Sequence, residues 1–153
     1  MKWLADTNIL LRSVQAAHPS FGDVDLAVGV LLARGDELCV IAQNLIEFWA
    51  VATRPIADNG LGLSIARANQ ELTKLKASFP VLPDTADILP EWEQLVVNHQ
   101  VLGKQVYDTR LVAAMRVHNL THLLTFNTAD FKRFSFITAV SPQAIFNDEL
   151  RSK

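Results

Sequence analysis

Short apolar runs alternate with longer segments of helical periodicity along the whole chain, and this alternation restricts the fold more than any other feature. We expect strands over residues 2–6, 38–42, 79–82 and 122–126, with a further edge strand over 136–140. Between these runs, apolar residues recur at three- and four-residue spacing, which is typical of amphipathic helices. Strands that alternate with helices form a parallel sheet covered on both faces. The sequence therefore predicts an α/β protein with three α/β/α layers and a central parallel sheet of four to five strands.

Three details of the helices are specific enough to be tested. Residues 43–53 are nearly all apolar, so we expect their helix to be buried on most of its surface. A helix capped by Ser64 should place Ile65 in the core, as the first member of its apolar stripe. Another helix should open at Asp108 and stop at Asn119, a residue that tolerates the left-handed conformation found at helix ends.

Composition limits the class of protein. A chain of 153 residues suits one compact domain, which we expect to span 1–153. No apolar run is long enough to span a membrane and no secretory signal precedes Asp6, so we expect a cytoplasmic protein without a membrane partner. Cys39 is the single cysteine, which excludes an internal disulfide. With 14 basic and 16 acidic residues, the chain has no overall positive charge to attract nucleic acid, so such a partner must be bound by local cations and by metal.

Four acidic residues occupy positions in the predicted elements where a carboxylate could bind a ligand or a metal ion. Two of them lie at or just after the ends of predicted strands, one opens a helix, and one interrupts an apolar helix; in that order they are Asp6, Asp130, Asp108 and Glu47. Ligand sites in open parallel sheets lie beyond the carboxyl ends of the strands. We therefore expect the four side chains to converge at one edge of the sheet.

Each acidic residue also has an ordinary structural explanation. Asp6 can be a turn residue, Asp108 a helix N-cap, and Asp130 a first-turn acid that complements the helix dipole. Glu47 is harder to explain in this way, because burial of an ionised carboxylate in an apolar helix costs several kcal/mol unless the group is paired. Its ordinary explanation is an ion pair with Arg12 or Arg54.

Convergence of four carboxylates has a chemical consequence. Ionised groups so close together repel one another, and a divalent cation relieves the repulsion. A set of oxygen ligands without histidine or cysteine suits Mg²⁺ or Mn²⁺ better than zinc. An ion held in this way can generate hydroxide from bound water and direct it at a phosphodiester. The acidic pattern therefore predicts metal-dependent phosphodiester hydrolysis.

The acidic segments resemble the four acidic blocks of PIN-domain ribonucleases, in order and over nearly the whole chain. The matching segments are Asp6-Thr7-Asn8, Glu47 in its apolar helix, 107–114 and 124–131, and the segment 54–63 is similar to one found in VapC-type toxins. The resemblance implies a parallel sheet that carries Mg²⁺ or Mn²⁺ at its carboxyl edge and an endonuclease that cleaves RNA. It also implies a cognate antitoxin that inhibits the enzyme. We further expect the protein to form a homodimer.

The resemblance further implies roles for individual residues. The principal metal ligands would be Asp6, Glu47 and Asp108, with Asp130 as a fourth acid. Hydrogen-bonding supports for these acids would be Asn8, Asn127 and Thr128. Proximity in sequence, rather than the resemblance, marks four candidate contacts to RNA phosphates, for which solvated surface charge is the alternative: Lys104, Arg110, Lys132 and Arg133.

Two other functions remain open at the level of sequence. One is a structure-specific DNA nuclease that uses the same carboxylates, since no feature of the sequence reads a 2′-hydroxyl. The other is a non-catalytic PIN-like module that binds a protein or a nucleic acid. Two further classes are disfavoured: no strand precedes Gly60 for a dinucleotide-binding loop, and the Asp6 segment lacks the second aspartate of haloacid dehalogenase-type phosphatases.

Overall fold

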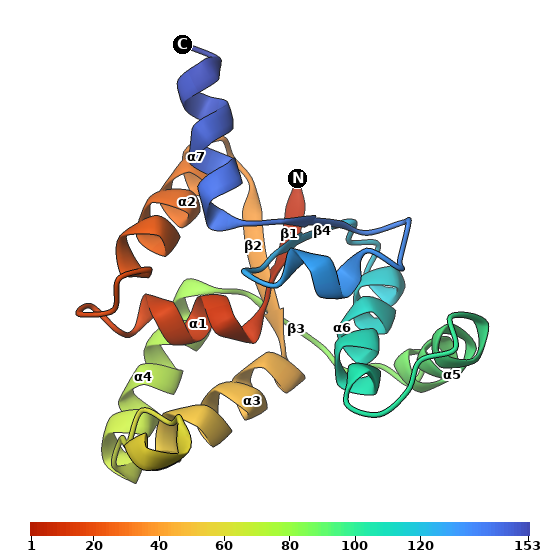
Figure 1. Ribbon diagram of the computed structural model, residues 1–153, viewed down its shortest axis with the longest axis horizontal. Coiled ribbons are helices and arrows are strands. Elements are labelled where there is room, and N and C mark those ends of the chain that lie inside the picture. The colour runs from red at the N-terminus through yellow and green to blue at the C-terminus, as the bar shows by residue number, and fades with distance from the viewer.

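A parallel sheet of five strands runs through the centre of the protein (Figure 1). The computed structural model describes all residues, 1–153. The strands lie in the order β3-β2-β1-β4-β5, and every neighbouring pair is parallel. Their bounds are β1 (Lys2–Ala5), β2 (Glu37–Ile41), β3 (Val81–Leu82), β4 (His122–Leu124) and β5 (Thr138–Val140). The predicted α/β/α fold with a central parallel sheet is therefore confirmed.

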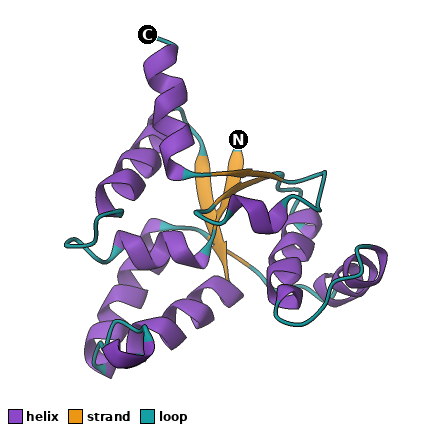
Figure 2. Ribbon diagram, in the orientation of Figure 1, coloured by secondary structure: helices purple, strands orange, loops and turns teal.

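Helices enclose the sheet on both faces (Figure 2). The α-helices are α1 (Thr7–Ser13), α2 (Phe21–Ala33), α3 (Ala42–Thr53), α4 (Ile65–Ser78), α5 (Ile88–Asn98), α6 (Gln105–Val117) and α7 (Pro142–Arg151). Two short 3₁₀ helices are η1 (Ile56–Asp58) and η2 (Thr128–Phe131). None of the helices is both long and apolar enough to cross a membrane.

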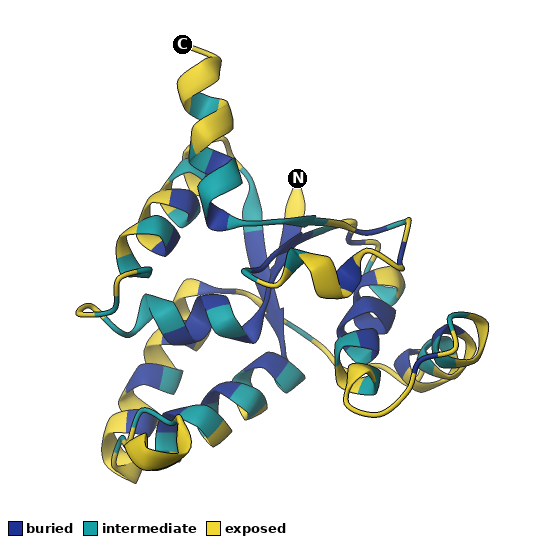
Figure 3. Ribbon diagram, viewed as in Figure 1, coloured by how far each residue is buried: buried dark blue, intermediate teal, exposed yellow.

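The alternation of side chains along each strand divides the core into two parts. In β1, Trp3 and Ala5 pack with residues of α1, α2, α3, α4 and α7, whereas Leu4 packs with residues of α5 and α6. Figure 1 shows these two groups of helices on opposite sides of the sheet. The strands and the inner helix faces are buried, and most of the outer faces are exposed (Figure 3).

The central strand delivers the chain to the middle of the carboxyl edge of the sheet. β1 pairs with β2 on one side and with β4 on the other. The backbone N–H of Asp6 then donates to the carbonyl oxygen of Leu124 at 3.0 Å, which extends the β1–β4 pairing by one residue. Asp6 is thus fixed between neighbouring strands, at the position where parallel sheets bind their ligands.

The three specific expectations about the helices are partly confirmed: Ser64 caps α4, and Asn119, just after α6, has a left-handed backbone with a φ of 57°. One detail of each expectation is wrong. Only Asn44, Phe48 and Ala52 of α3 are buried, and Ile46 is 69% exposed, because α3 packs through one face. Ile65, the first residue of α4, is 67% exposed rather than in the core. The sixth α-helix begins at Gln105, so Asp108 lies inside its first turn instead of opening it.

A C-terminal helix, α7, follows the edge strand β5, where the sequence analysis predicts no further element. Its start nevertheless carries ordinary signals: the Ser141 side chain accepts a hydrogen bond from the N–H of Ala144, and Pro142 occupies the first turn. Ile145 is buried in the core against the sheet, and Glu149 pairs with Arg34 at 2.7 Å. These contacts attach α7 to α2, away from the carboxyl edge.

Candidate functional site

Asp6 occupies the first position after β1 and caps α1. Its Oδ1 accepts a hydrogen bond of 2.7 Å from the backbone N–H of Thr7, while Oδ2 accepts one of 2.7 Å from Thr125 Oγ1 and a longer one of 3.4 Å from Asn8 Nδ2. The residue is only 7% exposed. Each carboxylate oxygen has two lone pairs, so these contacts fix the orientation of the group and still leave it able to accept further partners.

The surroundings of Asp6 disfavour its charge. Burial raises the pKa of the carboxyl group, and the hydrogen bonds from Thr125 and Thr7 offset part of that rise. The nearby carboxylates of Glu47 and Asp130 raise the pKa further. Two acids that are distant in sequence therefore act on Asp6 through space.

Glu47 is held by two hydrogen bonds on the face of α3 that approaches the end of β1. Thr7 Oγ1 donates to Oε2 at 2.7 Å, and Gln43 Nε2 donates to Oε1 at 2.9 Å. Neither Arg12 nor Arg54 forms an ion pair, and Arg12 instead donates to the side chain of Gln15. The ordinary explanation of Glu47 as half of a buried ion pair is therefore wrong.

Asp108 faces the same region from the first turn of α6. Its pKa is raised to about 6, first by burial and then by the charges of Asp6, Asp130 and Glu47. The N-cap explanation does not apply, because the N-cap of α6 is Lys104. The other three predicted acids thus all raise the pKa of Asp108, although the four acids come from four separate parts of the fold.

Asp130 lies in the first turn of η2 and is exposed. Its charge raises the pKa of both Asp6 and Asp108, so it belongs to the same electrostatic cluster. Its position in a first turn also agrees with the ordinary explanation as an acid that complements a helix end. Among the four acids, Asp130 is the most accessible to solvent.

The donor set has the chemistry that Mg²⁺ or Mn²⁺ prefers, because every candidate ligand is a carboxylate oxygen. With the side chains in their present positions, no three of the His, Cys, Asp or Glu residues are arranged to hold one ion directly. Mg²⁺ normally keeps several waters and uses only one or two protein carboxylates. The oxygen-only donors of the four acids are therefore compatible in their chemistry with a hydrated Mg²⁺ or Mn²⁺ ion.

Among the predicted supports, the structure brings only Asn8 into the acidic cluster by its side chain. Asn8 Nδ2 contacts both Asp6 and Thr125, and Asn8 Oδ1 accepts from the N–H of Phe126. Asn127 contributes its backbone N–H to Thr125 Oγ1 at 3.0 Å, rather than its side chain. Thr128 makes no side-chain hydrogen bond to the acids.

The sequence reasoning missed the residues that hold the acids most directly. Thr125 is fully buried and orients Asp6, Thr7 connects Asp6 with Glu47, and Gln43 orients Glu47. A signal was present for Thr125, since a polar residue directly follows the apolar pair Leu123-Leu124, close to a candidate acid. Nothing local in the sequence indicates which acid Gln43 would contact.

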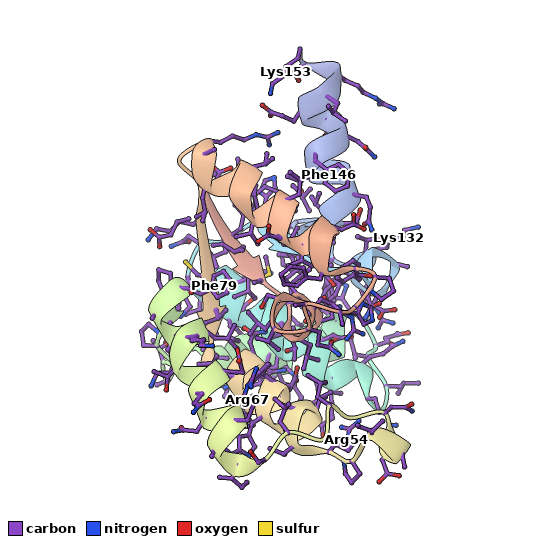
Figure 4. All side chains as sticks on the ribbon, turned by 90° about the vertical axis from the view of Figure 1, so that its left-hand side faces the viewer. Arg54, Arg67, Phe79, Lys132, Phe146 and Lys153 are labelled. Carbon is purple, nitrogen blue, oxygen red and sulfur yellow. The ribbon has the colours of Figure 1, made fainter.

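Among the four basic candidates, Arg110 shares a hollow with one of the acids, Glu47. It donates to Gln43 Oε1 at 3.1 Å and to Asp84 Oδ2 at 3.2 Å, and it lines a hollow of about 510 Å³ together with Glu47. Lys104 is exposed at the start of α6, and Lys132 projects at the surface just after η2 (Figure 4). Arg133 donates to the side chain of Gln105.

Comparison with known protein families assigns the chain to one of them. The profile of the PIN domain matches residues 4–137, which include all four acids. The chain belongs to the PIN domain family. No curated protein matches the sequence of this PIN domain at a significant level.

Solved structures share the fold of this PIN domain over most of their length. VapBC2 from Rickettsia felis, bound to a DNA fragment from the promoter, is 15% identical with a TM-score of 0.69 and covers 92% of this chain and 98% of its own. VapBC-1 from nontypeable Haemophilus influenzae is 15% identical with a TM-score of 0.66 and coverages of 94% and 99%. VapC20 from Mycobacterium tuberculosis, a toxin that cleaves the sarcin-ricin loop, is 16% identical with a TM-score of 0.63 and coverages of 86% and 95%. At these identities the likeness shows a common fold.

Proposed function

We propose that this PIN domain is a metal-dependent endoribonuclease and the toxin of a toxin–antitoxin pair. The observation that carries the proposal is that burial, and then the charges of Asp6, Asp130 and Glu47 from other elements of the fold, raise the pKa of Asp108 to about 6. Groups whose charges destabilise one another in the empty protein gain most from a bound cation. Family membership supports the same conclusion, because the profile matches the segment that contains these acids.

In the proposed mechanism, Asp6, Glu47 and Asp108 would hold a hydrated Mg²⁺ or Mn²⁺ ion, in part through its waters, and Asp130 would contribute a fourth carboxylate from the solvent side. An ion held there would supply a water of lowered pKa as the nucleophile and would balance charge on the phosphodiester. Thr7 and Thr125 keep the Asp6 carboxylate in one orientation, as Gln43 does for Glu47. Hydrogen bonds of this kind tune metal affinity, because they fix the ligand before the ion arrives.

The substrate and the partners are also part of the proposal. VapC20, which shares the fold, is described as a toxin that cleaves the sarcin-ricin loop, and the VapBC proteins were solved as complexes. We therefore propose RNA as the substrate, a cognate antitoxin as the inhibitor and a homodimer as the assembly. Arg110 is the favoured phosphate contact, because its guanidinium lines the same hollow as Glu47.

Nuclease assays test the enzymatic part directly. Wild-type protein is incubated with matched single-stranded and structured RNA and DNA, in Mg²⁺, in Mn²⁺ and in EDTA. We expect RNA cleavage that requires the metal and that is lost in Asp6→Asn, while Asp25→Asn, at an exposed acid of α2, cleaves like wild type. Preferential cleavage of DNA would favour the DNA nuclease. Failure to cleave any substrate would favour the non-catalytic module.

Expression in bacterial cells tests the toxin role. Induction of the wild-type protein should arrest growth, and induction of Asp6→Asn should not, because the arrest depends on cleavage. The cognate antitoxin is sought as a small protein encoded beside this chain; its co-expression should restore growth, and it should copurify with the wild-type protein. Equal growth of cells that express either protein at equal levels would contradict the role as a toxin.

A further inference from the structure

Two hollows at the surface adjoin each other beside the proposed acidic site. One measures about 510 Å³ and contains Glu47, and the other measures about 350 Å³ and lies between α5 and α6. Tyr107 and Arg110 line both hollows. The remaining lining of the second hollow is mainly apolar and includes Ile88, Leu89, Trp92 and Val106. An apolar recess therefore begins where the proposed site for phosphodiester cleavage ends.

The second hollow offers aromatic and apolar faces to a ligand. Tyr107 precedes Asp108 in the chain and is 63% exposed, which is unusual for a large aromatic side chain without a partner. Trp92 donates its indole N–H to the carbonyl oxygen of Val106 at 2.9 Å, so the polar edge of its ring is already satisfied. Ile88, which is 3% exposed, closes the hollow toward the core.

Gln43 connects this hollow rigidly to the acidic cluster. Its Nε2 donates to Glu47 Oε1 and to the backbone carbonyl of Tyr107, both at 2.9 Å. Its Oε1 accepts from Arg110 Nη1 at 3.1 Å. The amide side chain of Gln43 thus fixes the positions of Glu47, Tyr107 and Arg110 relative to one another.

We propose that the hollow between α5 and α6 is a subsite for one nucleobase of the RNA substrate, which stacks on Tyr107 next to the scissile phosphate. The inference rests on the proposed nuclease function. A nucleobase has an apolar face that stacks on aromatic rings, and its neutrality avoids repulsion by the neighbouring carboxylates. Bases of single-stranded RNA can be splayed away from the chain into such a recess. The attached phosphate then lies within reach of Arg110.

A binding experiment tests the subsite without cleavage. The Asp6→Asn protein in Mg²⁺ is titrated with short fluorescent single-stranded RNAs in which one abasic nucleotide is moved along the sequence. We expect a loss of affinity of roughly tenfold or more at one position, as stacking of one base requires. Addition of Tyr107→Leu should weaken binding of the intact RNA by a similar factor and remove the effect of that abasic position. Tyr107→Phe should preserve both, and Leu102→Ala, at an 81% exposed residue outside the hollow, serves as control.

Cleavage kinetics with wild-type Asp6 separate this inference from the proposed function. Tyr107→Leu should raise KM or lower kcat/KM for intact RNA and leave the metal requirement unchanged. If RNA is cleaved but each abasic position affects Tyr107→Leu as much as it affects wild type, the proposed base subsite is wrong and the proposed nuclease function stands. If the abasic effect depends on Tyr107 but no RNA is cleaved, the subsite stands and the nuclease is wrong. Loss of partner-protein binding with unchanged RNA binding in Tyr107→Leu would assign the hollow to a protein instead and overturn the inference.

Discussion

Thr125 donates a hydrogen bond from Oγ1 to Asp6 Oδ2 at 2.7 Å, although 119 positions separate the two residues in sequence. The bond joins the carboxyl ends of the neighbouring strands β1 and β4. Thr125 Oγ1 also accepts from Asn8 Nδ2 and from the N–H of Asn127. One buried hydroxyl therefore organises the centre of the acidic cluster.

Replacement of Thr125 by valine should damage the site more than the fold. Valine keeps the shape but removes the donor to Asp6, so the pKa of Asp6 should rise further and metal affinity should fall about 10- to 100-fold. The free energy of unfolding should fall by roughly 1–3 kcal/mol, since buried partners lose their hydrogen bonds. Isothermal titration with Mn²⁺ and urea unfolding measure the two effects. Thr125→Ser should restore most of the affinity, and Thr73→Val on the exposed face of α4 should change neither quantity.

Replacement of Asp6 by asparagine should not destabilise the metal-free protein. Asparagine still caps α1 through its side-chain oxygen, and it removes a charge that burial, Glu47 and Asp130 all disfavour. We expect the free energy of unfolding in EDTA to equal or exceed that of wild type, with no metal-dependent cleavage. Urea unfolding monitored by tryptophan fluorescence gives this value. Global unfolding of Asp6→Asn at neutral pH would assign a structural role to Asp6.

Stability in EDTA should fall as the pH rises from about 4 to about 6. The pKa of Asp108 is about 6 in the folded protein and near the ordinary value of 3.8 in the unfolded chain. Between these values the unfolded chain binds fewer protons, so rising pH favours unfolding. Partial exposure limits the loss to roughly 2 kcal/mol. Urea titrations across this range should show the decline in wild type and a flatter profile in Asp108→Asn. A flat wild-type profile would contradict the raised pKa of Asp108, which comes first from burial and then from the neighbouring acids.

Addition of Mg²⁺ or Mn²⁺ should stabilise the folded protein. An ion that binds only the folded state contributes about 2.7 kcal/mol when its concentration is a hundred times its Kd. For a domain of this size the shift in Tm is about 2–4 °C per kcal/mol. Thermal scans at increasing Mn²⁺ should therefore show a saturable increase in Tm for wild type and for Asp25→Asn. Asp108→Asn should show a smaller increase, and an equal one would exclude Asp108 as a ligand.

The sequence by itself determined the layers of this protein and the identity of its acids. Apolar runs such as 38–42 and 122–126 are too short for helices and too apolar for exposed strands, so they predicted a buried parallel sheet. The start of α7 is also marked by local signals, the N-cap Ser141 and Pro142 in the first turn, so this helix is predictable from the sequence alone. Local patterns are sufficient for these features because each depends on residues a few positions apart.

Only the tertiary structure decided how the acids are held and what lies beside them. The contacts Thr125–Asp6, Thr7–Glu47 and Gln43–Tyr107 join residues far apart in the chain. Periodicity shows that α3 has an apolar face but not how much of it is covered, so the exposure of Ile46 depended on which helices pack against it. The pKa of Asp108 depends on its burial and on the distances to three other charges, and both exist only once the strands have been ordered in the sheet.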